Sequence, residues 1–208
     1  MIATGPTVFV VDDDPSVLRA MDRLLRAAGY AVEAHASPAA FLEGAPSERP
    51  GCVVVDLRMP GLSGLELQEA LARRGCLLPI VFLTGHGDVS SSVRAMKTGA
   101  IDFLTKPCDD IVLLAAVERA IARDAAVRAA RREQQALRTR FEALTPRERE
   151  VCLRVARGLT NKHIAEELGA AEKTIKVHRG RVMEKLGVES VADLVRLVDR
   201  LQGPDPCP

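Results

Sequence analysis

The stretch VVVDLRMPG, residues 53–61, joins an apolar run to the carboxylate of Asp56 and then to a Pro-Gly turn signal. A short apolar run of this kind indicates a strand that is buried on both faces, as in a parallel sheet covered by helices. Parallel strands deliver the residues at their carboxyl ends to the ligand-binding edge of such a sheet. The sequence therefore predicts that Asp56 lies at this edge.

Three other apolar runs also end in residues that can carry chemistry. The acids Asp12 and Asp13 follow the run Thr7–Val11, a hydroxyl group (Thr84) ends a later run, and an amine (Lys106) ends another. Candidate helices separate these runs, and the alternation predicts an α/β doubly wound, five-stranded parallel sheet with helices on both faces. The candidate strands are residues 7–11, 31–35, 51–55, 79–83 and 101–104, and the candidate helices lie near residues 16–28, 38–44, 64–74, 88–98 and from about 110 onward.

The rear part of the chain carries only helical signals. No Gly or Pro interrupts the sequence between Asp110 and Pro146, and apolar residues recur at steps of three and four. Residues 121–141 are predicted to be a helical linker, either the seam of a coiled coil or one amphipathic helix that lies on the first domain. Caps, glycines and apolar spacing predict four helices within residues 142–202, and residues 203–208 are predicted to be a disordered tail.

The net charge of +1 conceals an uneven distribution. Residues 1–117 carry 10 Lys and Arg against 14 Asp and Glu, whereas residues 118–140 carry 7 against 3. An acidic front half followed by a basic segment indicates that the two halves bind different partners.

The composition argues against several protein classes. A hydrophobic content of 47% with 27% charged residues is typical of a soluble globular protein. No apolar segment approaches the roughly 20 residues of a membrane span, and no signal-peptide pattern begins the sequence. The five Cys residues have no paired spacing, which favours reduced thiols over disulfides or a zinc site. A cytoplasmic protein without a membrane partner is therefore expected.

The acids at the predicted sheet edge need a cation. Asp12, Asp13 and Asp56 would repel one another unless a positive charge neutralised them, and oxygen ligands without His or Cys favour Mg²⁺. A carboxylate beside Mg²⁺ can attack phosphorus and form an acyl phosphate, while Lys106 and Thr84 supply a cation and a hydroxyl donor for the phosphoryl group. The residues thus predict phosphoryl chemistry at Asp56.

The motifs DDD, VVVDLRMPG, FLTG and DFLTKP occur in this order, and residues 7–117 resemble the receiver domain of bacterial two-component response regulators. The resemblance implies a CheY-like sheet with strand order 2-1-3-4-5, within a receiver domain of residues 1–120. It also implies that Asp56 is the phosphorylated residue, with Lys106 and Thr84 as its catalytic partners.

The same resemblance assigns the remaining residues of the receiver site. The Mg²⁺ ligands would be Asp12, Asp13, Asp56 and the backbone carbonyl of Arg58. Phe103 would form the switch together with Thr84, and the peptide bond between Lys106 and Pro107 would be cis. The nearby His86 is interpreted as an ordinary loop histidine.

The segment 172–186 is a candidate helix whose exposed face is basic. Residues 173–185 include five Lys or Arg and one Glu, and a basic helix after a short Gly-containing turn is the helix-turn-helix pattern. A solvated charged face would give the same local signal. The whole of residues 142–201, with LTPREREV, ARGLTNKHIAEELG and EKTIKVHRGRVMEKLGV, resembles the LuxR-type DNA-binding domain.

This second resemblance implies roles for individual residues. Lys176 and Val177 would face bases in the major groove. The last helix would supply the dimer contact, and Glu148 and His178 would be structural. The residues implied to bind phosphates are Asn161, Lys162, Thr174, and Lys173 or Arg179, and those implied in the dimer contact are Val191, Leu194, Val198 and Leu201.

Two positions depart from the LuxR-type pattern. Ala171 occupies the N-cap of the recognition helix, where a polar residue is usual, and this should cost about 0.5–2 kcal/mol. Gly180 stands in mid-helix, where some relatives have a basic residue that contacts DNA, and costs about 1 kcal/mol relative to Ala.

The combination most resembles response regulators of the FixJ/StyR type and implies a transcription regulator in a phosphorelay, not an enzyme. A sensor histidine kinase would phosphorylate Asp56, the protein would form a homodimer, and the dimer would bind promoter DNA and act on RNA polymerase. A Mg²⁺-dependent phosphatase or phosphotransferase is an alternative. Enzymes of that kind typically have a general acid two residues after the nucleophile, and this chain has Arg58 at that position, which argues against the alternative. A protein-binding adaptor that never contacts DNA is a second alternative.

Overall fold

The computed structural model describes residues 5–44, 49–85 and 89–202. The chain divides into two compact units, residues 1–127 and 128–208. His86 and the tail 203–208 lie outside the described residues. The boundary between the units falls inside the predicted linker, so each unit is considered by itself.

The first unit contains five parallel strands in the order β2-β1-β3-β4-β5, which confirms the predicted fold class and strand order. Its strands are β1 (Thr7–Val11), β2 (Ala31–His35), β3 (Gly51–Val55), β4 (Ile80–Thr84) and β5 (Asp102–Thr105). Its helices are α1 (Pro15–Ala27), α2 (Pro38–Glu43), α3 (Gly64–Arg73), α4 (Val89–Lys97) and the first part of α5 (Asp110–Glu142).

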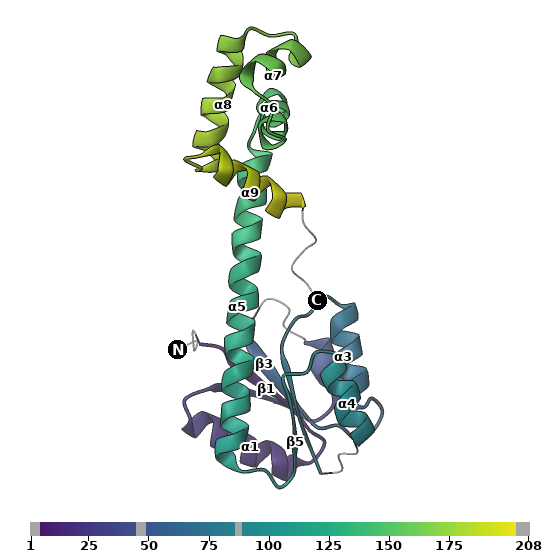
Figure 1. Ribbon diagram of the computed structural model, residues 1–208. Coiled ribbons are helices and arrows are strands. Elements are labelled where there is room, and N and C mark those ends of the chain that lie inside the picture. The colour runs from purple at the N-terminus through teal and green to yellow at the C-terminus, as the bar shows by residue number, and fades with distance from the viewer. Residues whose placement is uncertain (1–4, 45–48, 86–88, 203–208) are drawn as a thin grey trace. The chain divides into compact units, whose positions relative to one another are not determined.

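Helices cover both faces of this sheet, and Figure 1 shows α1 and α5 on one side with α3 and α4 on the other. Alternate residues of β1 explain the two layers, because successive side chains of a strand point to opposite faces. Phe9 and Val11 belong to the apolar cluster beneath α2, α3 and α4, whereas Val8 and Val10 pack against residues of α1 and α5. Because all five strands are parallel, their carboxyl ends lie along the same edge of the sheet.

The strands β4 and β5 each begin one residue later than the sequence predicts. Pro79 has no N–H to donate to the ladder, and only its carbonyl takes part by accepting from the N–H of Val53 at 2.9 Å. Regular pairing therefore starts at Ile80. The shift leaves Thr84 as the last residue of β4, at the sheet edge where Asp56 lies.

The helix α5 is a single helix over Asp110–Glu142 and crosses the boundary between the two units. Its first part buries Leu113, Ala116, Val117 and Ala120 against the sheet. One turn later Asp124 is also buried, four residues beyond the end of the predicted receiver domain. A coiled-coil seam along this helix stays a prediction.

The second unit consists of the end of α5 and four further helices: α6 (Pro146–Ala156), α7 (Asn161–Leu168), α8 (Glu172–Leu186) and α9 (Val191–Gln202). The predicted capping box is present at α6, where Thr145 and Glu148 satisfy each other's backbone N–H groups. Gly169 and Gly187 end α7 and α8 in the left-handed conformation, as glycines after helices usually do.

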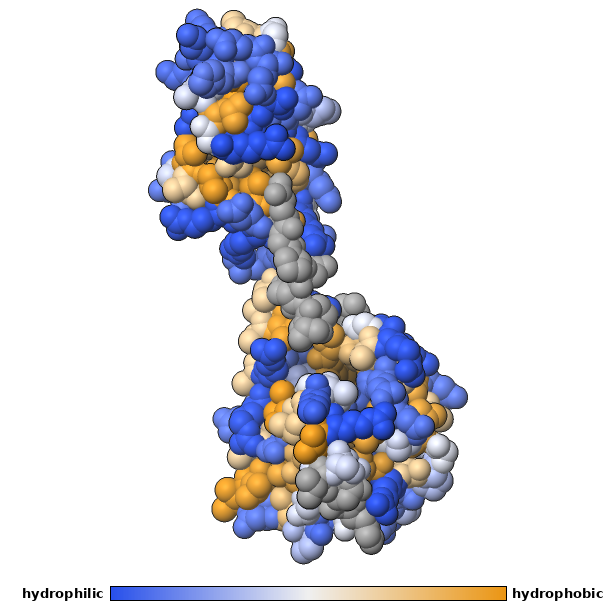
Figure 2. All heavy atoms as spheres, turned by 45° about the vertical axis from the view of Figure 1, so that its right-hand side comes forward, coloured by the Kyte–Doolittle hydropathy of each residue, from blue (hydrophilic) through white to orange (hydrophobic). Residues whose placement is uncertain are grey.

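Figure 2 shows hydrophilic residues over most of the visible face of each unit, with apolar residues in smaller patches between them. In the part of the chain that the structure describes, we found no helix of sufficient length and apolarity to span a bilayer.

Candidate functional site

Three of the predicted chemical residues meet at the carboxyl edge of the sheet. The Nζ atom of Lys106 lies 2.6 Å from Oδ2 of Asp12 and 2.9 Å from Oδ1 of Asp56. Asp12 and Asp56 are only 4% and 8% exposed, so a half-buried ammonium group here contacts two buried carboxylates. Residues 94 and 50 positions apart in the chain thereby form one charge cluster.

The backbone around Asp56 holds its carboxylate in place. The N–H of Asp56 donates to the carbonyl of Val11 at 2.9 Å, and the N–H of Arg58 donates to Oδ2 of Asp56 at 2.6 Å. Gly64, the first residue of α3, packs so closely that a Cβ atom there would lie 2.4 Å from the carbonyl oxygen of Asp56. Only glycine fits at this position without displacing the peptide group that carries Asp56.

Lys106 stays charged in this cluster. Burial opposes its positive charge, but the hydrogen bonds that it donates to Asp12 and Asp56, together with their negative charges, outweigh burial and raise the pKa of Lys106 above its usual 10.5. A fixed cation beside Asp56 is the group that would stabilise added negative charge on that carboxylate.

The two predicted switch residues lie on neighbouring strands. Thr84 ends β4 and is buried, and its carbonyl accepts from the N–H of Lys106 at 2.7 Å. Phe103 of β5 is half-buried, with its ring 6.0 Å from that of Phe82. The peptide bond between Lys106 and Pro107 is cis, which confirms that prediction.

The donor set suits a small hard cation. In the described ranges, no three His, Cys, Asp or Glu side chains lie together as a ready metal cluster, and Asp13 points into solvent. Asp12 and Asp56 nevertheless converge on one point, and Mg²⁺ needs only one or two protein carboxylates because it keeps several waters. The residues present therefore fit Mg²⁺, with Asp13 adjacent to supply a further carboxylate.

A second candidate site lies on the exposed face of α8. Lys173, Thr174, Lys176 and Val177 are all exposed there, whereas Ile175, Val182 and Leu186 are buried in the unit's core. An exposed valine that follows two exposed lysines offers both apolar and cationic contacts to a partner. This is the composition that a helix needs to read base edges in the major groove.

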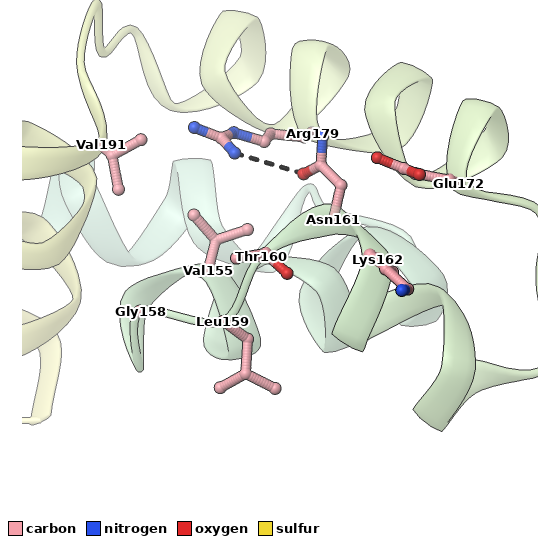
Figure 3. Close-up of a pocket in the computed structure, with 9 residues that line it drawn as sticks. All are labelled: Val155, Gly158, Leu159, Thr160, Asn161, Lys162, Glu172, Arg179 and Val191. Atoms are coloured by element: carbon pink, nitrogen blue, oxygen red, sulfur yellow. Dashed lines mark hydrogen bonds between the residues drawn. The ribbon is translucent and has the colours of Figure 1, made fainter.

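The remaining predicted phosphate contacts meet beside this face. Figure 3 shows Arg179 of α8 pointing to Asn161 of α7, with its Nη1 donating to Oδ1 of Asn161 at 3.2 Å. Lys162 and Thr160 line the same hollow, which has a volume of about 460 Å³. Asn161, Lys162 and Arg179 thus lie around one polar hollow, although they come from different helices.

Both departures at α8 have structural consequences. No side chain caps the N-terminus of α8 at Ala171, and a Cβ atom built on Gly180 meets nothing within 4 Å. Gly180 therefore carries a cost in helix propensity without relieving any crowding within the unit.

We expect Gly180→Ala to stabilise the second unit by about 1 kcal/mol, because Ala has the higher helix propensity and space is available. Amide exchange of core residues in the full chain measures this stability. Gly187→Ala is the matched control and should destabilise the unit, because Gly187 has a φ of 68°. A loss of stability in Gly180→Ala would mean that the open space is absent in solution.

The four residues of α9 that were predicted to form a dimer contact differ in their burial. Leu194 and Val198 are buried in the core of their own unit, where α9 packs against α6, and a dimer contact through α9 stays a prediction. Val191 and Leu201 are only half-buried. The spacing of these four residues indicated one apolar face, but it could not show that most of that face was needed within the unit.

Two structurally important residues were not predicted from the sequence. Gly64 gave no signal beyond a glycine at a helix start, and its role depends on contact with the carbonyl group of Asp56, eight residues earlier. Asp124 lies in the segment predicted to be a helical linker, and its burial reflects a contact with β3. The one signal for the burial of Asp124 was that a charged residue continues the apolar, core-facing side of this helix.

Comparisons with known proteins agree with this geometry. Residues 8–118 match the family model described as the response regulator receiver domain, and residues 142–198 match the model described as bacterial regulatory proteins, luxR family. Nodulation protein W of Bradyrhizobium diazoefficiens is 47% identical over 199 residues, which cover 96% of this chain and 88% of that protein.

Two further relatives extend along nearly the whole chain. Transcriptional regulatory protein FixJ of Rhizobium meliloti is 42% identical over 194 residues, covering 93% of this chain and 95% of that protein. The solved structure of response regulator StyR is 51% identical with a TM-score of 0.85, covering 94% of this chain and 98% of that one. The similarity thus includes both units.

Proposed function

Because the chain belongs to the two-component response regulators that join a receiver domain to a LuxR-type DNA-binding domain, we propose that it regulates transcription in response to phosphorylation of Asp56. The observation that carries this proposal is the buried cluster in which Lys106 contacts both Asp12 and Asp56. The two family matches support a histidine kinase and DNA as partners, and action in the cytoplasm is part of the proposal.

Phosphoryl transfer would use the geometry around Asp56 directly. A carboxylate oxygen of Asp56 attacks the phosphorus of the kinase phosphohistidine, so that a P–O bond forms, the P–N bond breaks and the imidazole leaves. Lys106 then pairs with the phosphoryl oxygens, and its fixed charge lowers the cost of the transition state. Asp12, Asp13, Asp56 and the carbonyl of Arg58 would hold Mg²⁺, which supplies further positive charge at the phosphoryl group.

The proposed switch begins at Thr84. Its hydroxyl donates to the phosphoryl group, and Phe103, which already contacts the apolar cluster beneath α4, turns further inward. Val93 and Met96 of α4 are large apolar side chains that are about half exposed, and they support a dimer contact on this surface. A homodimer would bring two copies of α8 to two half-sites of promoter DNA, where RNA polymerase is recruited.

We expect Lys176→Ala to weaken binding to a specific promoter fragment by about 1–3 kcal/mol, because the lysine would contact a base edge. Lys162→Ala should instead weaken binding to all sequences and reduce the salt slope by about 1, as loss of a phosphate contact does. Fluorescence anisotropy at several salt concentrations separates the two effects.

Arg23→Ala, an exposed charge removal on α1, is the control and should leave DNA affinity unchanged. Unchanged affinity in Lys176→Ala would remove this residue from the interface. If the wild-type protein bound no promoter fragment at low salt, the adaptor alternative would replace the proposal. Genome-wide footprinting with and without a phosphoryl donor identifies the fragments to use.

A further inference from the structure

Asp124 of α5 is a buried carboxylate at the end of the sheet opposite the phosphoryl site. It is 3% exposed, and its Oδ2 accepts a hydrogen bond from the N–H of Gly51 at 3.0 Å. Gly51 is the first residue of β3, and Asp56 directly follows the last. One rigid, fully buried strand therefore runs from the Asp124 contact to the phosphorylated residue.

An apolar residue would suit this position on α5 for packing alone. Leu113, Ala116, Val117 and Ala120 precede Asp124 on the same face of the helix, and all are buried against the sheet. A buried carboxylate costs free energy relative to a well-packed apolar side chain, whereas its hydrogen bond is directional and specifies one arrangement. Asp124 is therefore better suited to positioning the helix than to stabilising it.

The partner of Asp124 cannot shift easily. A Cβ atom on Gly51 would lie 1.9 Å from the carbonyl oxygen of Thr7, so β3 starts in direct contact with β1. The N–H of Thr7 also donates to the carbonyl of Pro50 at 2.9 Å. The hydrogen-bond donor that Asp124 accepts from is thus fixed by the sheet.

A second contact attaches α5 to the start of β5. Nη2 of Arg119 lies 2.5 Å from Oδ2 of Asp102, and Oδ1 of Asp102 accepts from the N–H of Phe103 at 2.8 Å. The side chain of Arg119 is 55% exposed, so solvent screens this pair and its contribution is small. The buried contact of Asp124 is the stronger of the two attachments.

We propose that Asp124 is a positioning residue that fixes the rotation and the axial position of α5 against β3. The helix continues into the second unit. A structural change that follows phosphorylation of Asp56 would therefore reach residues 128–142 through α5, which Asp124 attaches to β3 in the last turn before residue 128. This inference rests on the proposed function, because it gives the route by which phosphorylation affects DNA binding.

The test compares three variants of the full chain. Asp124→Leu removes the hydrogen-bond acceptor and fills a similar volume. If that variant does not fold, Asp124→Ala is used in its place. Asp124→Asn keeps an oxygen that can accept from Gly51, and Glu118→Ala removes an exposed carboxylate from the same helix as a control. Three quantities are measured: phosphoryl uptake from acetyl phosphate, promoter affinity with and without that donor, and amide exchange of Gly51 and residues 121–127.

We expect Asp124→Leu to take up the phosphoryl group at the wild-type rate, since the contact lies at the far end of β3. Its gain in promoter affinity on phosphorylation should fall by about fivefold or more, and its residues 121–127 should exchange faster. Asp124→Asn and Glu118→Ala should behave as wild type. A full gain in Asp124→Leu, with only lower thermal stability, would overturn the inference and leave Asp124 a purely structural residue.

The exchange measurement separates this inference from the proposed function. If the wild-type protein itself gained no affinity on phosphorylation, the proposed function would fail. Unchanged exchange at Gly51 and residues 121–127 in Asp124→Leu would instead refute the positioning role, whatever the DNA binding showed.

Discussion

Asp56→Asn is expected to take up no phosphoryl group from acetyl phosphate. The amide of asparagine is not nucleophilic, and the other buried acid of the cluster, Asp12, follows a different strand, β1, and is held 2.6 Å from Lys106. The variant should fold, because Lys106 keeps Asp12 as its partner and asparagine can still accept from the N–H of Arg58. Intact-protein mass spectrometry measures the added phosphoryl group.

Asp199→Asn on the exposed face of α9 is the matched control, and it should be labelled as fully as the wild-type protein. Labelling that persists in Asp56→Asn would show that another residue accepts the phosphoryl group. In that case the cluster around Lys106 would be a structural ion pair, and the account of the receiver site would be wrong.

Lys185→Met is expected to destabilise the second unit by about 2–3 kcal/mol at neutral pH. Glu148 is 3% exposed and lies 2.6 Å from Nζ of Lys185, so loss of the cation leaves a buried carboxylate that still accepts from the N–H of Thr145 but has lost its positive partner. Lys185 is 38% exposed, and solvent reaching it keeps the cost below that of a fully buried pair. Amide exchange in the full chain reports the stability of this unit separately from the receiver.

The pH dependence of this effect has a definite sign. The hydrogen bond from Lys185, followed by that from the N–H of Thr145, lowers the pKa of Glu148 from 4.5 to about 2. Because the folded pKa is the lower one, the contribution of Glu148 is fully present above pH 4.5 and is lost as the pH falls towards 2. The difference between wild type and Lys185→Met should therefore shrink over this range.

Arg196→Met is the control for this experiment, since its ion pair with Asp193 is long at 3.9 Å and mostly exposed. It should change stability by no more than about 0.5 kcal/mol. Equal stabilities for Lys185→Met and the wild-type protein at neutral pH would mean that Glu148 is solvated in solution.

The sheet could be predicted from the sequence because its strands are apolar runs of the right length between capped helices. Four strand ends carried Asp12, Asp56, Thr84 and Lys106, and parallel topology alone brings such ends to one edge. The residue types indicated phosphoryl chemistry at Asp56, but the assignment of the metal ligands and of the switch came from resemblance, because spacing along the chain does not show which side chains meet. The ion pairs of Lys106 are visible only in three dimensions.

Other features depend on contacts that have no local signature. Asp124 and Gly51 are 73 residues apart, and neither the acid nor the glycine indicates the other. Leu194 and Val198 had the spacing of one apolar helix face, and this spacing did not show that they lie in the core of the second unit. In each case the contacting residues are distant in the sequence. Periodicity therefore predicted the helix but not the residues that pack against it.

The most direct test of the account is a titration of one promoter fragment with the full chain, with and without acetyl phosphate and Mg²⁺. The account predicts tighter and cooperative binding with the donor for the wild-type protein, and no change for Asp56→Asn. Equal affinities for the wild-type protein under both conditions, with Asp56 shown to be phosphorylated, would contradict it.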